Sequence, residues 1–145
     1  MIQQGMKIIG LSVVTNNVDG NGMHDIGNLW KEFYEKGIMQ LINNRVNDKV
    51  YSIYTDYESD YRGDYTTIIG VEVDSLMNIP EGMVARSFEG GEFLKFQAIG
   101  ELPQAVGAKW QEIWQKNEEL NRAYTYDYEV YGELENGVAI YIAQK

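Results

Sequence analysis

Hydrophobic and polar positions change their period along the chain in a way that predicts short strands interrupted by two helices. Runs rich in β-branched and aromatic residues, bounded by Gly, Asn, Asp or Ser, are typical of strands. The predicted strands are Met6 to Thr15, Val50 to Glu58, Tyr65 to Asp74, Gly82 to Phe88, Glu92 to Ile99, Tyr124 to Tyr131 and Val138 to Ala143.

Two segments instead carry hydrophobic residues at helical spacing. In the first segment, Asp25 can cap the helix and Gly37 can end it. The apolar face of that helix would consist of Ile26, Leu29, Trp30, Phe33 and Tyr34. The second helix would begin near Pro103, and its apolar stripe would consist of Val106, Trp110, Ile113 and Trp114.

The order of these elements repeats. Each half contains a strand, a Trp-bearing helix and two further strands, and the triplet Asp-Tyr-Glu at 56–58 recurs at 127–129. Agreement in element order as well as in sequence favours an internal duplication. A length of 145 residues is typical of one domain. We therefore predict a single α+β domain over residues 1–145, with pseudo-repeats over roughly 1–78 and 79–145.

Tyrosine is the unusual residue of this chain, with 11 copies, most of them in windows 51–65 and 124–131. Side chains alternate between the two faces of a strand. In the second window this alternation puts Asp127, Glu129 and Tyr131 on one face. In the first window it puts Tyr54 with Asp56 and Glu58, opposite the other aromatic residues. Two interpretations follow: a half-exposed sheet with an acidic solvent face, or a pocket in which tyrosines surround a carboxylate.

Charge and missing residue types exclude several function classes. The net charge of −10 argues against direct nucleic-acid binding, which needs a basic surface. The longest uncharged run, Ile8 to Val18, is too short to cross a membrane. With no Cys, a single His (His24) in a loop-like stretch and no phosphate-binding glycine motif, we expect no metal site and no cofactor. The default location is the cytoplasm.

Several segments, taken together and in this order, resemble the GyrI-like small-molecule-binding superfamily. This superfamily includes the effector-binding domains of AraC-type and MerR-type multidrug regulators. The resemblance spans nearly the whole chain and leaves no room for a helix-turn-helix. The segments that carry it are Leu29 to Phe33, Tyr51 to Glu58, Ile69 to Val73, Ile79 to Gly82, Tyr126 to Tyr131 and Val138 to Ile142.

The resemblance implies a curved, mostly antiparallel sheet formed by two strand-helix-strand-strand repeats, with two helices lining a central cleft. Members of this kind bind bulky aromatic and often cationic compounds against a buried acidic residue. Glu129, within Asp-aromatic-Glu-x-Tyr, matches that position, and Tyr131, Tyr54, Trp110 and Trp30 would line the cleft.

The remaining candidates have weaker support. Glu58, which corresponds to Glu129 in the first repeat, is a second candidate for the ligand carboxylate. We expect Trp114 to serve only in the core, Tyr61 and Tyr65 to border a turn, and Asp127 to hold a turn or a backbone amide.

The function predicted from these observations is that of a stand-alone, monomeric protein that binds aromatic or cationic small molecules over Glu129. Two alternatives stay open at this point. One is a hydrolase of electrophilic, cyclopropane-bearing toxins with Glu129 as its catalytic acid or base. The other is a protein-binding role like that of gyrase inhibitors, and we favour binding over catalysis.

Overall fold

The computed structural model describes all residues from Met1 to Lys145 as an α+β fold. Its strands are β1 (Ile2–Gln3), β2 (Met6–Thr15), β3 (Val50–Thr55), β4 (Tyr65–Val73), β5 (Val84–Phe88), β6 (Gly91–Ile99), β7 (Tyr126–Leu134) and β8 (Gly137–Ala143). Its helices are the short 3-10 turn η1 (Val18–Gly20), α1 (Asn21–Glu35), α2 (Ile38–Leu41) and α3 (Gln104–Gln115).

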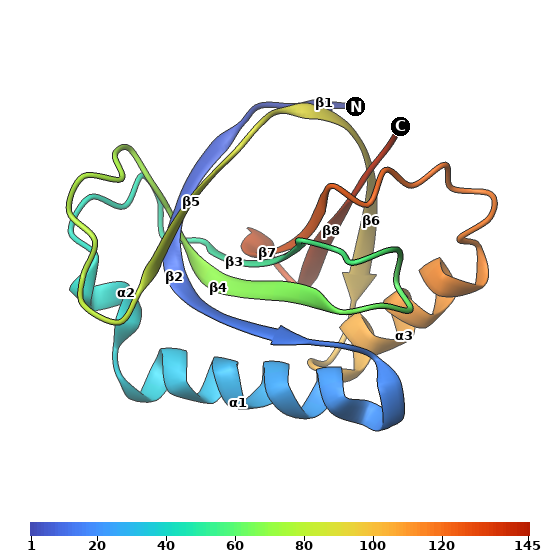
Figure 1. Ribbon diagram of the computed structural model, residues 1–145, viewed down its shortest axis with the longest axis horizontal. Coiled ribbons are helices and arrows are strands. Elements are labelled where there is room, and N and C mark those ends of the chain that lie inside the picture. Colours follow the sequence, from blue (N-terminus) through green and yellow to red (C-terminus); the bar gives the residue numbers. More distant parts are fainter.

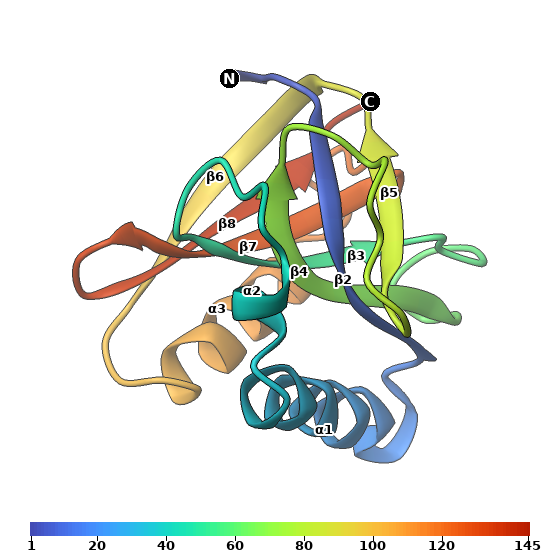
Figure 2. The same cartoon turned by 90° about the vertical axis from the view of Figure 1, so that its left-hand side faces the viewer.

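The eight strands form one curled antiparallel sheet in the order β1-β6-β8-β7-β3-β4-β2-β5 (Figures 1 and 2). Strands β3 and β7 pair at the centre, and each is followed outward by the other two strands of its repeat. The predicted curved sheet of two strand-helix-strand-strand repeats is therefore confirmed. The Asp-Tyr-Glu triplets are not equivalent, however, because residues 56–58 follow the end of β3 while residues 127–129 lie inside β7.

Several element boundaries differ from the prediction, including both ends of β7 and the start of β5, and local structure explains two of the differences. Strand β3 ends at Thr55 instead of Glu58 because Asp56 adopts a left-handed backbone with φ of 51°, which interrupts the pleat. Helix α1 begins at Asn21, so Asp25 lies inside the helix and does not cap it. The Asp25 carboxylate instead accepts a 2.7 Å hydrogen bond from the Thr15 hydroxyl.

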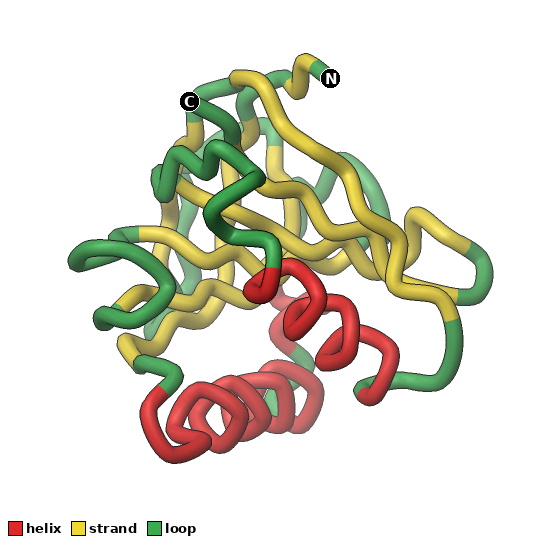
Figure 3. The backbone as a smooth tube through the Cα atoms, turned by 90° about the vertical axis from the view of Figure 1, so that its right-hand side faces the viewer, coloured by secondary structure: helices red, strands yellow, loops and turns green.

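The two faces of the sheet pack differently. One face packs against itself as the sheet curls, and its cluster joins side chains from β2 and β5 to side chains from β6, β7 and β8. The other face carries both long helices, α1 over β2 and α3 over β6 (Figures 1 and 3). Tyr34, predicted on the apolar face of α1, is 65% exposed and stacks on Trp30 at the helix edge.

A glycine pair allows the sheet to curl between β2 and β4. Gly10 lies directly opposite Gly70, and a Cβ on either residue would collide with the backbone of the other strand. Only glycine permits this close approach. No helix of the structure has the length and hydrophobicity needed to span a membrane.

Candidate functional site

A cavity of about 400 Å³ lies between the two long helices and the central strands. Helix α1 contributes Met23, Ile26 and Trp30 to its wall, and helix α3 contributes Val106, Trp110 and Trp114. The sheet and its adjoining loop contribute Tyr54, Tyr57, Tyr61, Tyr65, Glu129 and Tyr131. The two helices thus line a central cleft, as predicted, and eight of its 17 lining residues are aromatic.

A second groove, of about 620 Å³, runs along the turn from β6 to α3 and the hairpin between β7 and β8. Although it is larger, mostly exposed turn residues line it, and it contains no buried charge. The aromatic cavity is therefore the better candidate site, because binding sites are typically apolar with a few convergent polar groups.

Glu129 supplies the only carboxylate in the wall of this cavity. Its side chain is 2% exposed and is held by three donors. The carboxylate oxygen Oε2 accepts from the Tyr54 hydroxyl at 2.8 Å and from the Trp110 indole N–H at 2.6 Å. The other oxygen, Oε1, accepts from the Tyr131 hydroxyl at 2.6 Å.

The register of the central strands brings these groups together. Ser52 of β3 lies directly opposite Glu129 of β7, so Tyr54, two residues further along β3, shares the face of Glu129. Tyr131 reaches the same face by the alternation of β7, and α3 places Trp110 above them. The Ser52 hydroxyl also donates to the Tyr54 oxygen at 3.2 Å, which extends the network into the sheet.

The charge of Glu129 has no cationic partner in the protein, since none of the ion pairs involves it. Burial raises the pKa of its carboxyl, and the hydrogen bonds from Tyr131, Trp110 and Tyr54 oppose part of that rise. A buried carboxylate held by neutral donors alone is suited to receive a positive charge from outside the protein.

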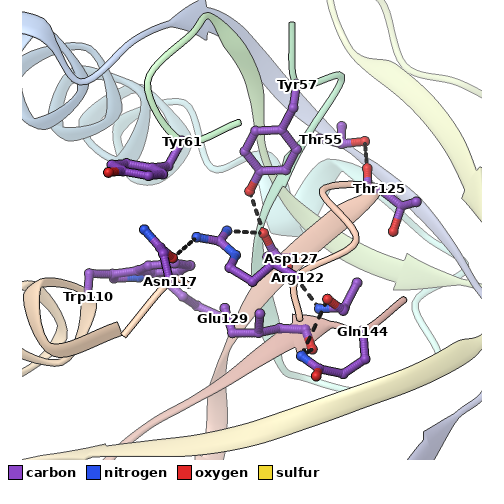
Figure 4. A network of polar contacts seen from close by, with 12 residues as sticks. Thr55, Tyr57, Tyr61, Trp110, Asn117, Arg122, Thr125, Asp127, Glu129 and Gln144 are labelled. Carbon is purple, nitrogen blue, oxygen red and sulfur yellow. Dashed lines mark hydrogen bonds and ion pairs between the residues drawn. The ribbon is translucent and has the colours of Figure 1, made fainter. Parts of the chain in front are cut away.

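The nearby cation, Arg122, is already neutralised. Its guanidinium donates to the Asp127 carboxylate at 2.7 Å, and both side chains are almost fully buried. Figure 4 shows Arg122 between Asn117, which accepts a 2.9 Å hydrogen bond from it, and Asp127. Asp127 also accepts from the Tyr57 hydroxyl at 2.5 Å and from the backbone N–H of Ala143 at 2.9 Å. The prediction that Asp127 holds a backbone amide is confirmed.

All five residues predicted to line the cleft do line the cavity: Glu129, Tyr131, Tyr54, Trp110 and Trp30. Their contact with a ligand stays a prediction. Glu58 is exposed and lies outside the cavity, in the loop that follows β3. His24 is exposed on α1, where its ring contacts Asn28, and it does not line the cavity.

Four further aromatic residues line the cavity against expectation: Tyr57, Tyr61, Tyr65 and Trp114. Strand alternation predicts Tyr57 on the face opposite Tyr54, but the left-handed Asp56 between them reverses the alternation. Tyr61 and Tyr65 border a turn, as expected, but that turn lies at the cavity wall. The prediction that Trp114 serves only in the core is wrong, since its ring lies in the cavity wall, 6.4 Å from that of Trp110.

Sequence reasoning missed Ser52 and Arg122 as parts of the site. Ser52 is a small polar residue inside a strand, and only its register against Glu129 reveals its role. Arg122 follows α3 in an irregular segment, and its burial against the Tyr124 ring, 4.4 Å from the ring centre, has no local signal. Within the site, no group of three acidic or imidazole side chains could hold a metal ion.

Comparison with known protein families gives a match that covers almost the entire chain. Residues 3–143 match the model of the Cass2 family, described as an integron-associated effector binding protein. The chain belongs to the Cass2 family. The resemblance to GyrI-like effector-binding proteins that the sequence suggested is thereby confirmed.

Two solved structures share the whole fold of this chain, and a bacterial protein matches most of its sequence. The integron cassette protein VCH_CASS2 from the mobile metagenome of Vibrio cholerae is 35% identical, with a TM-score of 0.80 over 100% of this chain and 94% of that one. YobU of Bacillus subtilis (strain 168) is 26% identical over 132 residues, which are 88% of this chain and 81% of YobU. A structure of SAV2435 bound to tetraphenylphosphonium is 19% identical, with a TM-score of 0.80 over 100% of this chain and 92% of that one. At that identity, SAV2435 shows a shared fold only.

Proposed function

We propose that this Cass2-family protein binds bulky aromatic cations in the cavity between α1 and α3, with the positive centre of the ligand close to Glu129. One observation carries the proposal. The carboxylate of Glu129 is 2% exposed, faces an aromatic cavity and contacts three neutral donors but no protein cation.

The physical argument combines a charge and several ring faces. A buried unpaired carboxylate is costly, and a cationic ligand that neutralises it lowers that cost. Trp and Tyr faces add cation–π attraction of roughly 0.5–2 kcal/mol each. Because rings and a single charge impose little directional geometry, the site should accept ligands of different shapes.

The relatives agree with this chemistry. The family is described as effector binding, and SAV2435, which shares the fold, was solved with tetraphenylphosphonium, an aromatic cation. The two alternatives raised by the sequence, a hydrolase with a catalytic Glu129 and a gyrase-inhibitor-like protein, stay untested predictions.

Titration of the tryptophan fluorescence tests the proposal, because Trp30, Trp110 and Trp114 all line the cavity. Tetraphenylphosphonium and its uncharged analogue tetraphenylmethane, in a low fraction of co-solvent, form a matched pair. We expect the wild-type protein to bind the cation at least about tenfold more tightly, which corresponds to about 1.4 kcal/mol. Incubation with an electrophilic, cyclopropane-bearing compound separates the two functions, because recovery of the unchanged compound from the complex would favour a binding protein over a hydrolase.

Glu129→Gln is the decisive variant because it removes the charge and keeps the shape. The amide oxygen can accept from Trp110 and Tyr54, and the amide nitrogen can donate to a rotated Tyr131 hydroxyl. We expect the preference for the cation to vanish in this variant. The matched control is Glu58→Gln, which changes the net charge equally but lies on an exposed loop outside the cavity. A preference that persists in Glu129→Gln, or that Glu58→Gln abolishes equally, would show that Glu129 is not the ligand carboxylate.

A further inference from the structure

The hydrogen-bonding capacity of Glu129 is almost filled by the protein itself. An ionised carboxylate offers about four lone-pair positions, two on each oxygen. Tyr54 and Trp110 occupy both positions on Oε2, and Tyr131 occupies one on Oε1. One position on Oε1 is therefore left for a ligand.

The hydroxyl groups of the surrounding tyrosines also form hydrogen bonds within the protein. The Tyr54 oxygen already accepts from Ser52, while the Tyr57 and Tyr65 hydroxyls donate to Asp127 and to the Asn17 side chain. A ligand in the cavity meets ring faces, the electric field of Glu129 and the hydroxyl oxygens of Tyr57, Tyr61 and Tyr65. These hydroxyl oxygens are neutral and therefore weaker acceptors than a carboxylate.

We propose that the site selects, among aromatic cations, those without N–H donors, and that the Tyr131 and Tyr54 hydroxyls determine this selectivity by occupying the Glu129 oxygens. The inference rests on the proposed function and specifies its ligand class as quaternary ammonium and phosphonium ions. A primary ammonium group brings three N–H donors. Inside the cavity it would lose its water partners and find one carboxylate position on Glu129, so that its other N–H groups are left with weaker neutral hydroxyl acceptors or with none.

A pair of ligands that differ only at the cationic centre tests this selectivity. Pyren-1-ylmethyl-trimethylammonium and pyren-1-ylmethylammonium carry the same ring system and the same charge at pH 7. Isothermal titration calorimetry gives the ratio of their dissociation constants. We expect the trimethylated ligand to bind wild-type protein at least about tenfold more tightly. Since its methyl groups also add apolar surface, the decisive quantity is how this ratio changes with substitution.

Tyr131→Phe removes the donor at Oε1, so a neutral hydroxyl acceptor is exchanged for a second, stronger carboxylate position, while the ring stays. We expect the ratio to fall about fivefold or more, chiefly because the primary ammonium ligand binds more tightly. Tyr61→Phe is the matched control, because its ring also lines the cavity but its hydroxyl does not contact Glu129. Tyr54→Phe provides a second variant if Tyr131→Phe does not fold, since it frees a position on Oε2.

Three results would overturn the inference: equal binding of the two ligands by wild-type protein, a ratio unchanged in the Tyr131 or Tyr54 variant, or an equal change in Tyr61→Phe. Failure of the proposed function looks different. In that case wild-type protein binds neither cation, or Glu129→Gln binds both as tightly as wild-type protein does.

Discussion

At the scale of single residues, the central feature is a carboxylate placed where its charge is poorly solvated. Tyr54, Trp110 and Tyr131 stabilise the anion of Glu129 through short hydrogen bonds, but none of them carries a positive charge. Arg122 cannot supply that charge, because it is committed to Asp127 within a separate buried pair. The protein without ligand therefore retains an electrostatic cost that a cation can relieve.

This cost should appear in the pH dependence of stability. Because burial raises the pKa of Glu129 in the folded protein above its ordinary value of 4.5, the folded protein binds this proton more tightly than the unfolded chain does. The associated stability is fully present below about pH 4.5 and is lost as the pH rises through the raised pKa. At pH values above the raised pKa, each pKa unit by which burial raises Glu129 lowers the free energy of unfolding by about 1.4 kcal/mol.

Urea denaturation of wild-type protein and Glu129→Gln between pH 4 and pH 8 measures this effect. We expect the variant to gain stability relative to wild-type protein as the pH increases, since other titrating groups are common to both proteins. A difference that stays constant over this range would contradict a raised pKa of Glu129 in the folded state.

At the scale of elements, the site depends on two strands and two helices that approach from opposite halves of the chain. The central β3–β7 pair sets which residues lie opposite one another, and α1 and α3 place tryptophans above that pair. The sheet curls so that both helices face one cavity. The close contact between Gly10 of β2 and Gly70 of β4 permits this curl.

Gly70→Ala should therefore destabilise the fold by about 1–3 kcal/mol or more, because its Cβ meets backbone that cannot move independently. Gly107→Ala is the contrasting variant, because Gly107 is exposed in the interior of α3 and a Cβ added there would meet no other atom. We expect it to stabilise the protein by about 0.4–1 kcal/mol. Denaturant midpoints measure both effects. If Gly70→Ala leaves the stability unchanged, the contact between β2 and β4 at Gly10 and Gly70 is not tight.

At the scale of the whole molecule, the curled sheet separates two environments. One face closes on itself to form a solid core, so the other face is available for a cavity between helices. The chain as a whole carries a net charge of −10. This surface charge attracts cations through solvent, where salt screens it, whereas Glu129 acts from within the cavity, where screening is weak.

Salt separates these two contributions. Raising the ionic strength from about 0.02 M to about 0.5 M shortens the screening length from roughly 20 Å to roughly 4 Å. We expect the affinity for tetraphenylphosphonium to fall less than about tenfold, while the affinity ratio between wild-type protein and Glu129→Gln changes little. Loss of that ratio at high salt would assign the attraction to the surface charge instead.

The sequence by itself determined the kinds of elements and most of their places, because strand and helix periods are local properties. It identified the long strands and both tryptophan helices, but gave no signal for the short elements β1 and α2, which pairing and packing define. It also placed Glu129 and Tyr131 on one face of β7, since alternation along an uninterrupted strand needs no tertiary information.

Tertiary structure decided which of two identical triplets becomes the site. Asp-Tyr-Glu at 56–58 lies in a loop where Glu58 is exposed, whereas Asp-Tyr-Glu at 127–129 lies in a central strand where Glu129 is buried. The local sequence is the same, so burial, the register against Ser52 and the approach of Trp110 make the difference. These are contacts between residues distant in the chain, and only the folded arrangement specifies them.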